Sequence, residues 1–394
     1  MNDTGDGVDT ASPTRGTGDL VRGYRDEFPI LGSKTYLNSN SLGALSKRSI
    51  AERHEYERLW NEMGAAAWYE IWWNKLEQVR TQFGMTIGAP AESIALMPSV
   101  SGALATVSGG LQAAGDRRKK IVITSLDFPT LGHHYYSRES LGYEVVMVES
   151  HDGVTVPLEA IRAAVDEDTL MLATSHVFFT SGTTQDARHL AEIAHESGAY
   201  ILLDAYQSNG QIPIDVGDMG VDFLTSGGLK WLCGGPGAAY LYVDRNVDIL
   251  PTTLSWFGVE NQFGFELRAR PRTDARRFEL GTPAVGCAYT AAGGLSIVLE
   301  AGIERIAERN RMLARDLRER LADAGHQLHQ ADGPDVRSAL VLVEHVEAAQ
   351  AVRWLAENDV IVDSRGHLLR FSPHFYNSID DNVRAVEVLQ DFQP

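Results

Sequence analysis

Short apolar runs alternate with longer segments of helical periodicity over most of this chain. The runs that the pattern predicts as buried strands are 94–97, 121–125, 171–174, 201–203, 221–225 and 238–243. Helical periodicity covers 46–83, with a break near Gly64, and 187–197. Strand, helix and strand in alternation predict an α/β fold, with a mostly parallel sheet that helices cover on both faces.

The pattern changes after Val285 to long amphipathic helices, predicted at 288–301 and 303–324, the second densely charged. This change predicts a large domain over 36–284 and a smaller α+β domain over 285–394. We expect 20–35 to pack with the smaller domain. Residues 1–19 contain almost nothing apolar and are predicted to form a disordered tail.

The composition is that of a globular protein, with 44% hydrophobic and 22% charged residues in a chain of 394. A formal net charge of −18 argues against a nucleic-acid partner, because phosphates would be repelled. No apolar run has the length of a membrane span and the N-terminus has no signal-peptide core, so we expect no membrane partner and a cytoplasmic location. The two cysteines, Cys233 and Cys287, suggest neither a disulfide framework nor a metal site.

One carboxylate and one amine follow two neighbouring predicted strands. Asp204 ends the apolar run 201–203, and Lys230 follows the run 221–225 and two glycines. Burial lowers the pKa of a lysine, and a neutral amine is what Schiff-base chemistry requires. Pyridoxal phosphate (PLP) needs such a lysine and an acid against its pyridine nitrogen. Taken alone, the same residues fit a helix-capping Asp and a surface Lys in a turn equally well.

The wider sequence around this pair resembles a known superfamily. The motifs D-A-Y-Q-S-N-G from Asp204, S-G-G-x-K-W-L around Lys230 and G-G-P-G at 234–237 are similar to the core of the class V aminotransferase superfamily of fold type I PLP enzymes. That superfamily holds kynureninases, isopenicillin N epimerase-like proteins and cysteine desulfurases. The resemblance covers about 36–377 and implies PLP as cofactor, a seven-stranded type of sheet sandwiched by helices, and a homodimer with shared active sites.

The resemblance also implies a set of cofactor contacts. A helix N-terminus after the strand 94–97 is a natural phosphate site, since its N–H groups are free. The implied cofactor-binding residues are Ser99, Val100, Ser101, Phe128, Thr180, Asp204, Gln207, Ser226, Lys230, Trp256 and Thr282. Phe128 would stack on the pyridine ring, Ser226 would reach the phosphate, and Thr282 would come from the neighbouring subunit. His176 would lie near the cofactor or be a hydrogen-bonded core histidine.

The substrate side of the pocket is implied by two further motifs. The segment N-S-L-G places Asn40 and Ser41 at the substrate, although a plain turn that caps the next helix explains it as well. The motif R-x-S-P-H-F-Y-N places Arg370 where its guanidinium would bind the α-carboxylate. Trp68 and Trp72 share a helix face, which predicts either core or subunit packing or an aromatic wall at the pocket mouth.

These residues predict an enzyme that transforms an L-α-amino acid through an external aldimine and a Cα carbanion. We favour a lyase that cleaves Cβ–S, or Cβ–C, because Lys230 alone supplies the base and Leu229 precedes it where the superfamily often has a helper. Transamination is the alternative, followed by decarboxylation and by epimerisation, for which Tyr135 or His374 would supply the second proton donor. Neither cysteine lies in a loop suited to persulfide transfer. A catalytically silent binding protein of the same fold is the non-enzyme hypothesis.

Overall fold

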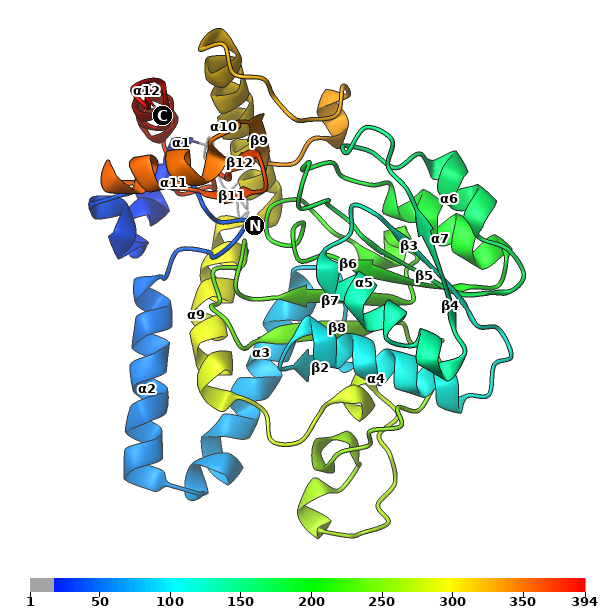
Figure 1. Ribbon diagram of the computed structural model, residues 1–394. Helices are drawn as coiled ribbons and strands as arrows, with labels where there is room; N and C mark the ends of the chain where they lie inside the picture. The colour runs from blue at the N-terminus through cyan, green and yellow to red at the C-terminus, as the bar shows by residue number, and fades with distance from the viewer. Residues whose placement is uncertain (1–17, 394) are drawn as a thin grey trace, which may run out of the picture.

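The computed structural model describes residues 18–393. Figure 1 shows a large sheet with its helices and, beside it, a smaller group of helices and strands from the C-terminal part of the chain. The predicted tail 1–19 lies outside the described residues except for Gly18 and Asp19, which begin helix α1 (Gly18–Tyr24) instead of belonging to a tail.

The large sheet has seven strands, of which only β8 runs against its neighbours. In spatial order the strands are β2 (Ile94–Met97), β8 (Ala239–Val243), β7 (Phe223–Gly227), β6 (Tyr200–Asp204), β5 (Thr169–Ser175), β3 (Lys120–Thr124) and β4 (Glu144–Val148). The predicted mostly parallel, seven-stranded sheet is therefore confirmed. Because the strands from β7 to β4 are parallel, their carboxyl ends meet at one edge, where sheets of this kind bind ligands.

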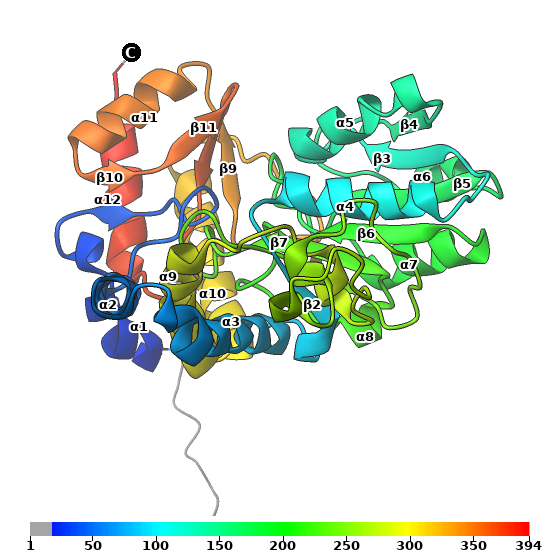
Figure 2. The same ribbon diagram turned by 90° about the horizontal axis from the view of Figure 1, so that it is seen from below.

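Helices cover both faces of this sheet, as Figure 2 shows. The helices are α4 (Val100–Ala113) and α5 (Pro129–Tyr136) on one face, and α6 (Leu158–Ala164), α7 (Ala187–Glu196) and α8 (Val216–Met219) on the other. Side chains of β6 alternate between the two resulting cores: Ile201 and Leu203 pack in the core with α7, and Leu202 packs in the core with α4. Burial on both faces explains why β6 is a continuous apolar run.

Three long helices stand beside the sheet. Helix α2 (Lys47–Met63) is followed by a π-helical turn (Trp68–Trp72) and α3 (Trp73–Met85), and α9 (Val285–Ala301) packs against both α2 and α3. The predicted amphipathic pattern is wrong for α9, because this packing buries residues around most of its circumference. It is confirmed for α10 (Ile303–Asp323), which buries one face only.

No single helix among the described residues is long and apolar enough to cross a membrane. Helices α9 and α10 reach the necessary length and apolar composition only when they are taken together, and this pair is bent by 82°.

The C-terminal part forms a separate small sheet with its own helices. Strands β9 (Val341–Glu344), β11 (Asp363–Arg365) and β12 (Leu368–Phe371) are antiparallel in the order β11–β12–β9, and the helices are α10, α11 (Ala348–Glu357) and α12 (Ile379–Gln390). The N-terminal segment attaches here: β1 (Thr35–Tyr36) pairs with β10 (Val360–Ile361), and Arg25 forms an ion pair with Asp381 at 2.7 Å. The predicted domain limits at 36 and 285 remain predictions.

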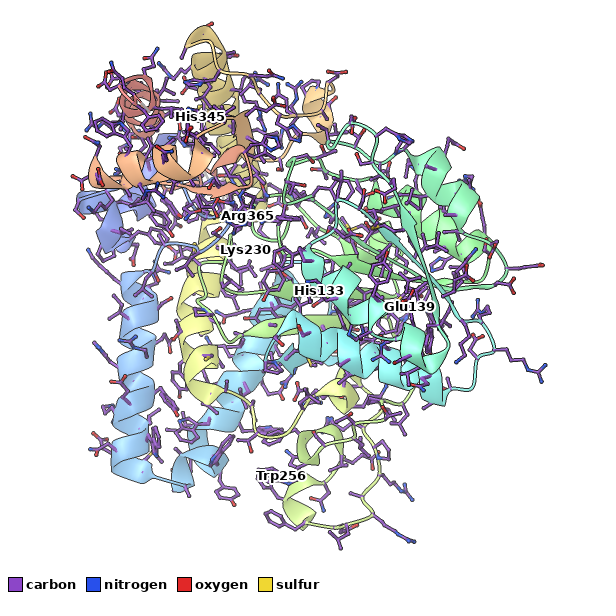
Figure 3. The ribbon with its side chains drawn as sticks, in the orientation of Figure 1. His133, Glu139, Lys230, Trp256, His345 and Arg365 are labelled. Atoms are coloured by element: carbon purple, nitrogen blue, oxygen red, sulfur yellow. The ribbon has the colours of Figure 1, made fainter. Side chains whose placement is uncertain are left out.

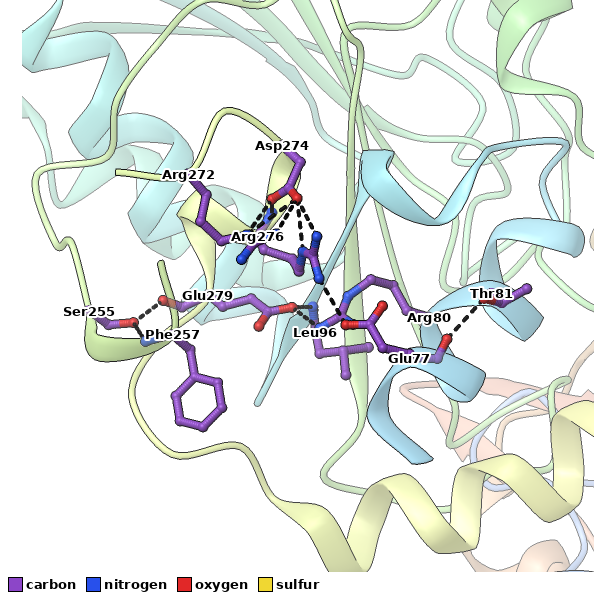
Figure 4. Close-up of polar contacts among 10 residues, drawn as sticks. All are labelled: Glu77, Arg80, Thr81, Leu96, Ser255, Phe257, Arg272, Asp274, Arg276 and Glu279. Atoms are coloured by element: carbon purple, nitrogen blue, oxygen red, sulfur yellow. Dashed lines mark hydrogen bonds and ion pairs between the residues drawn. The ribbon is translucent and has the colours of Figure 1, made fainter. Parts of the chain in front are cut away.

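A buried ion pair ties the long connection after β8 to the rest of the large domain (Figure 4). Arg80 of α3 is 2% exposed and its Nη2 lies 2.6 Å from Oε1 of Glu279. The same oxygen accepts the backbone N–H of Leu96 in β2 at 2.9 Å. Asp274 pairs with Arg272 and Arg276, and Arg276 reaches Glu77 of α3 at 2.8 Å. These contacts fix the segment that precedes Thr282.

Candidate active site

A cavity of about 330 Å³ opens at the carboxyl edge of the large sheet, where β6 ends at Asp204 and β7 leads to Lys230. Figure 3 labels Lys230 at the junction between the large sheet and the small one. The residues that line the cavity are Asn40, Ser41, Ser99, Val100, Ser101, Phe128, Thr130, Ser175, Val177, Phe179, Asp204, Tyr206, Gln207, Leu229, Lys230, Arg365 and Arg370. The structure thus brings most of the predicted site residues together.

Lys230 is held in a short loop that packs tightly against the N-terminal part of the chain. The backbone N–H of Gly43 donates to the carbonyl of Leu229 at 2.7 Å, and a Cβ at Gly43 would overlap the carbonyl oxygen of Lys230. The Lys230 amine lies 5.5 Å from the ring centre of Phe128 and 5.3 Å from that of Tyr206. Within residues 18–393 it has no hydrogen bond or ion pair, so it is available for a covalent bond to a ligand.

The charges around Lys230 suit a reactive amine. Burial lowers the pKa of Lys230 to about 8, although the negative charge of Asp204 acts in the opposite direction. Burial raises the pKa of Asp204 to about 6, against the effects of the Tyr206 hydrogen bond and the Lys230 charge. Near neutral pH, Asp204 is therefore still mostly ionised, and a sizeable fraction of the amine is neutral.

Asp204 is 5% exposed, and its Oδ1 accepts the backbone N–H of Tyr206 at 2.9 Å. A second buried acid, Asp127, supports the same edge of the sheet by accepting from Thr174 Oγ1 at 2.9 Å and from the backbone N–H of Ser175 at 2.6 Å. Asp127 directly precedes Phe128, so these bonds anchor the strand-to-helix turn that carries the aromatic ring. Sequence reasoning missed Asp127, because its partners lie 47 and 48 residues away.

The N-terminus of α4 forms another wall of the cavity. The Ser99 side chain caps this helix by accepting the N–H of Gly102 at 3.2 Å, and Ser99, Val100 and Ser101 all line the cavity. Two buried hydroxyl oxygens, Ser226 Oγ and Thr180 Oγ1, have no hydrogen-bond partner among the described residues, although neither residue lines the cavity. A helix N-terminus with free N–H groups is suited to a phosphate.

Arg370 forms the opposite end of the cavity, on β12. Its Nη1 donates to the carbonyl of Phe179 at 3.0 Å, its Nη2 donates to Ser41 Oγ at 3.1 Å, and its other bonds go to Asp363 on β11. Ser41 also donates to Asp363, and Asn40 bonds to Ser372 at 2.6 Å. The predicted substrate residues thus form one connected polar group around a buried guanidinium.

A second arginine at this end was not predicted. Arg365, on the strand β11 that also carries Asp363, lines the cavity and lies 3.3 Å from Asp363 through its Nη1. Figure 3 shows Arg365 above Lys230. Its signal in the sequence was weak, because an arginine in a short hairpin is usually a solvent-exposed residue.

Gln207 lines the cavity, but its amide also has structural partners. Nε2 donates to the carbonyl of Asn40 at 3.0 Å, and Oε1 accepts from Trp231 Nε1 at 3.0 Å. This amide therefore joins the Lys230 loop to the segment that carries Asn40 and Ser41.

Besides Ser226 and Thr180, three residues implied by the resemblance do not line this cavity. Within the single chain Trp256 and Thr282 lie elsewhere, and Figure 3 shows Trp256 far from Lys230. His176 lines a different cleft, because it alternates with Ser175 and Val177, whose side chains face the cavity.

Of the two alternatives for Trp68 and Trp72, the aromatic wall at the cavity mouth is wrong for the single chain. Trp68 and Trp72 contact each other with ring centres 5.1 Å apart, and neither lines the Lys230 cavity. The aromatic lining comes instead from Phe128, Phe179 and Tyr206. Packing of the tryptophans, the other alternative, is what the structure shows.

Comparison with known proteins identifies the family. The family model described as Aminotransferase class-V matches residues 36–384. An uncharacterized aminotransferase, YcbU, of Bacillus subtilis is 35% identical over 372 residues, which are 93% of this chain and 97% of the relative. A kynureninase of Geobacillus thermodenitrificans is 30% identical over 390 residues, 94% of this chain and 91% of the relative.

Among solved structures, the apo cysteine desulfurase of Thermococcus onnurineus superposes with a TM-score of 0.85 at 22% identity, over 97% of this chain and 99% of the other. The cystine C-S lyase C-DES superposes with a TM-score of 0.82 at 19% identity, over 93% and 100%. These two likenesses show the fold, which is that of the fold type I PLP enzymes. The chain belongs to the class-V aminotransferase family, and it is a PLP-dependent enzyme.

The residues of the cavity fit this cofactor. Lys230 offers an amine without a partner among the described residues, Asp204 offers a buried carboxylate, and the α4 N-terminus offers N–H groups for a phosphate. Phe128 meets Phe179 edge to face, with ring centres 5.2 Å apart, and is 40% exposed, so a face of its ring is available for stacking. PLP would be held by these residues, with Lys230 as the covalent attachment.

Proposed function

We propose that this enzyme is a lyase that breaks the bond between Cβ and a sulfur substituent of an L-α-amino acid. The single observation that carries the proposal is the set of proton-transfer groups in the cavity. Among the described residues, its lining contains the amine of Lys230, the phenol of Tyr206, whose pKa burial raises, and no histidine or cysteine. Elimination from Cβ needs one base, whereas epimerisation needs a second proton donor and persulfide transfer needs a cysteine. Transamination needs only the same lysine, so its products distinguish it from elimination.

Each polar residue has a task in this reaction. Arg370 would bind the substrate α-carboxylate through the one N–H of Nη1 that has no partner among the described residues, and Ser41 and Arg365 line the same cavity. Asp204 would hold a negative charge against the pyridine nitrogen. PLP, when bound, supplies the ring that accepts the electron pair left at Cα. Lys230 Nζ would take the proton from Cα and pass a proton to the departing sulfur, so that the Cβ–S pair leaves with the sulfur.

The burial and position of the two cysteines do not support persulfide transfer to a protein thiol. Cys233 is 1% exposed, burial raises the pKa of its thiol to about 12, and neither Cys233 nor Cys287 lines the cavity. A buried neutral thiol is a poor nucleophile.

Epimerisation would need a second proton donor on the other side of Cα. Tyr135 is buried and its hydroxyl donates to the sulfur of Met171, and His374 Nε2 donates to the carbonyl of Trp231 at 2.9 Å. Burial lowers the pKa of His374 to about 3. Since neither residue lines the cavity, the two donors expected for epimerisation do not support that reaction.

The test is product analysis with a cysteine S-conjugate. The proposal predicts that substrate and water yield pyruvate, ammonia and one free thiol in equal amounts. Formation of a keto acid that keeps its side chain, with the cofactor recovered in its amine form, would replace the lyase by an aminotransferase. Lys230→Ala serves as the inactive control.

L-Kynurenine is the second substrate to test. The kynureninase of Geobacillus thermodenitrificans is similar to this chain over nearly its whole length, which favours Cβ–C cleavage as the other lyase reaction. If kcat/KM is higher for kynurenine than for every cysteine conjugate, the enzyme is a Cβ–C lyase instead of a Cβ–S lyase.

We also propose that the enzyme is a homodimer with shared active sites. Thr282 is exposed and lies away from the Lys230 cavity of its own chain. Large apolar side chains of the connection between β8 and α9, which also carries Thr282, are exposed as well, namely Trp256, Phe265 and Leu267. A second copy of the chain would cover this surface and bring its Thr282 to the phosphate.

A further inference from the structure

A second cleft, of about 630 Å³, lies between the large domain and helix α10. The end of β5 separates it from the Lys230 cavity, since His176 lines the cleft and its neighbours Ser175 and Val177 line the cavity. Gln211 and Thr184 complete the wall on the large-domain side, and α10 with the segment 328–339 forms the other wall.

Four arginines line this cleft. Arg311, Arg315 and Arg318 share one face of α10, at spacings of four and three, and Arg337 approaches from the connection before β9. Within residues 18–393 none of the four forms an ion pair with a carboxylate. The cleft also contains two acids, the exposed Glu319 and Asp335, so four positive groups face two negative ones and a net charge of +2 remains.

The two inner arginines bond only to backbone carbonyls. Arg318 donates to Ser338 at 2.7 Å and to Leu340 at 3.1 Å, and Arg337 donates to Ala331 at 2.6 Å and to Asp332 at 2.8 Å. Carbonyl partners leave the charge of a guanidinium uncompensated. Burial lowers the pKa of Arg318 to about 10, and the neighbouring charge of Arg337 acts in the same direction.

Three polar atoms of the lining have no partner among the described residues. They are His176 Nδ1, Arg318 Nε and Gln330 Oε1, and all three are buried. His176 is only 4% exposed, and burial lowers its pKa to about 4, so its ring is neutral and carries one N–H donor. Buried polar atoms are normally satisfied, so the wall of the cleft has unused hydrogen-bonding capacity, which a ligand would reach once these side chains turn toward the cleft.

We propose that this cleft binds a small-molecule polyanion with two or more negative charges on phosphate or carboxylate groups. Arginine forks bind both groups through paired hydrogen bonds, and exposed Arg311 and Arg315 are placed to close over a ligand held by Arg318 and Arg337. The proposal does not depend on which bond the enzyme breaks at Lys230.

The cleft is connected to the active site by hydrogen bonds on two of its walls. The backbone N–H of His176 donates to the carbonyl of Asp204 at 2.8 Å, and Gln211 donates to the carbonyl of Gln207 while it accepts from Ala339 at 2.9 Å. Asn310, also in the lining, bonds to His374. A bound anion would therefore join α10 to the strand ends that carry the cofactor site.

Calorimetric titration of the PLP-loaded enzyme tests the proposal, with pyrophosphate and citrate as separate probes. Loading with PLP keeps the phosphate end of the active site filled. The test variant is the double substitution Arg311→Ser and Arg315→Ser, and the control is Arg353→Ser with Arg384→Ser, which removes two exposed arginines outside the cleft. Each lost charge-assisted contact weakens binding roughly tenfold, so the test variant should bind about 100-fold more weakly.

Saturable binding of at least one probe to wild type and control, with this loss in the test variant, supports the site. Pyrophosphate alone identifies phosphate as the preferred group, and citrate alone identifies carboxylate. Binding of neither probe to wild type overturns the proposal. Equal binding to wild type and test variant overturns it as well, because the anion then sits elsewhere. Thermal denaturation without probe checks that both double variants are folded.

Discussion

The guanidinium of Arg370 forms a bidentate ion pair with the carboxylate of Asp363, with Nε 2.8 Å from Oδ1 and Nη2 2.5 Å from Oδ2. The two residues face each other across the β11–β12 pair, so strand register alone sets this contact. Although burial opposes its charge, the bonds from Arg370 hold the pKa of Asp363 below its ordinary value. Within residues 18–393, four of the five N–H groups of Arg370 are occupied, by Asp363, Phe179 and Ser41, and one N–H of Nη1 remains for a ligand.

Asp363→Ala should therefore weaken binding of the substrate carboxylate. Arg370 would lose two of the four hydrogen bonds that orient it and would keep those to Phe179 and Ser41. We expect KM to rise about tenfold with a smaller change in kcat, since one well-oriented charged contact is lost. Asp359→Ala, which removes an exposed acid of the same part of the chain, is the matched control. An unchanged KM in Asp363→Ala would mean that Arg370 is held in place without its partner.

The lowered pKa of Lys230 predicts the pH dependence of its reactivity. A base with a pKa near 8 becomes neutral as pH rises through that value, so acylation of the cofactor-free protein at Lys230 should increase with a midpoint near 8. In Asp204→Asn the charge that favours the protonated amine is lost, and the midpoint should move to lower pH. Mass-spectrometric quantification of the labelled peptide measures both. A midpoint near the ordinary lysine value in the wild type would contradict the buried amine.

The ion pair of Arg80 and Glu279 predicts a large stability effect at a distance from the cavity. Arg80→Met leaves Glu279 buried without its cation and should lower the free energy of unfolding by about 3–5 kcal/mol. Adding Glu279→Gln removes the uncompensated charge while keeping an acceptor for Leu96, so the double variant should recover part of the loss. Urea unfolding of the three proteins provides the values. No recovery in the double variant would assign the loss to packing.

Shared active sites predict complementation between two inactive variants. Lys230→Ala and Thr282→Glu proteins, mixed under conditions of subunit exchange, form heterodimers in which one site has both native residues. Random exchange should restore roughly one quarter of wild-type activity. Analytical ultracentrifugation confirms the exchange. Zero recovery after proven exchange would place Thr282 within the site of its own chain.

The fold and the centre of the site were predictable because their signals are local. Apolar runs located β5, β6 and β7, and Asp204 and Lys230 directly follow two of them, so the parallel order of the sheet brings them together. The turn at Ser99, which we propose as the phosphate site, is likewise a short sequence of strand, cap and helix.

Residues whose position depends on distant pairing could not be found in this way. Asp363 and Arg365 enter the site only through the register of a hairpin in the C-terminal sheet. Asp127 acts through partners on another strand. The position of His176 outside the Lys230 cavity could have been predicted. Side chains alternate at the end of β5, so Ser175 and Val177 face one side and His176 faces the other.

Attachment of PLP to Lys230 is the central claim, and reduction of the purified enzyme with borohydride followed by peptide mapping tests it most directly. The account predicts a single pyridoxyl label on the peptide that contains Lys230, and no stable label in Lys230→Ala. A label on any other lysine, or an unmodified Lys230 peptide from an enzyme that retains PLP, would contradict it.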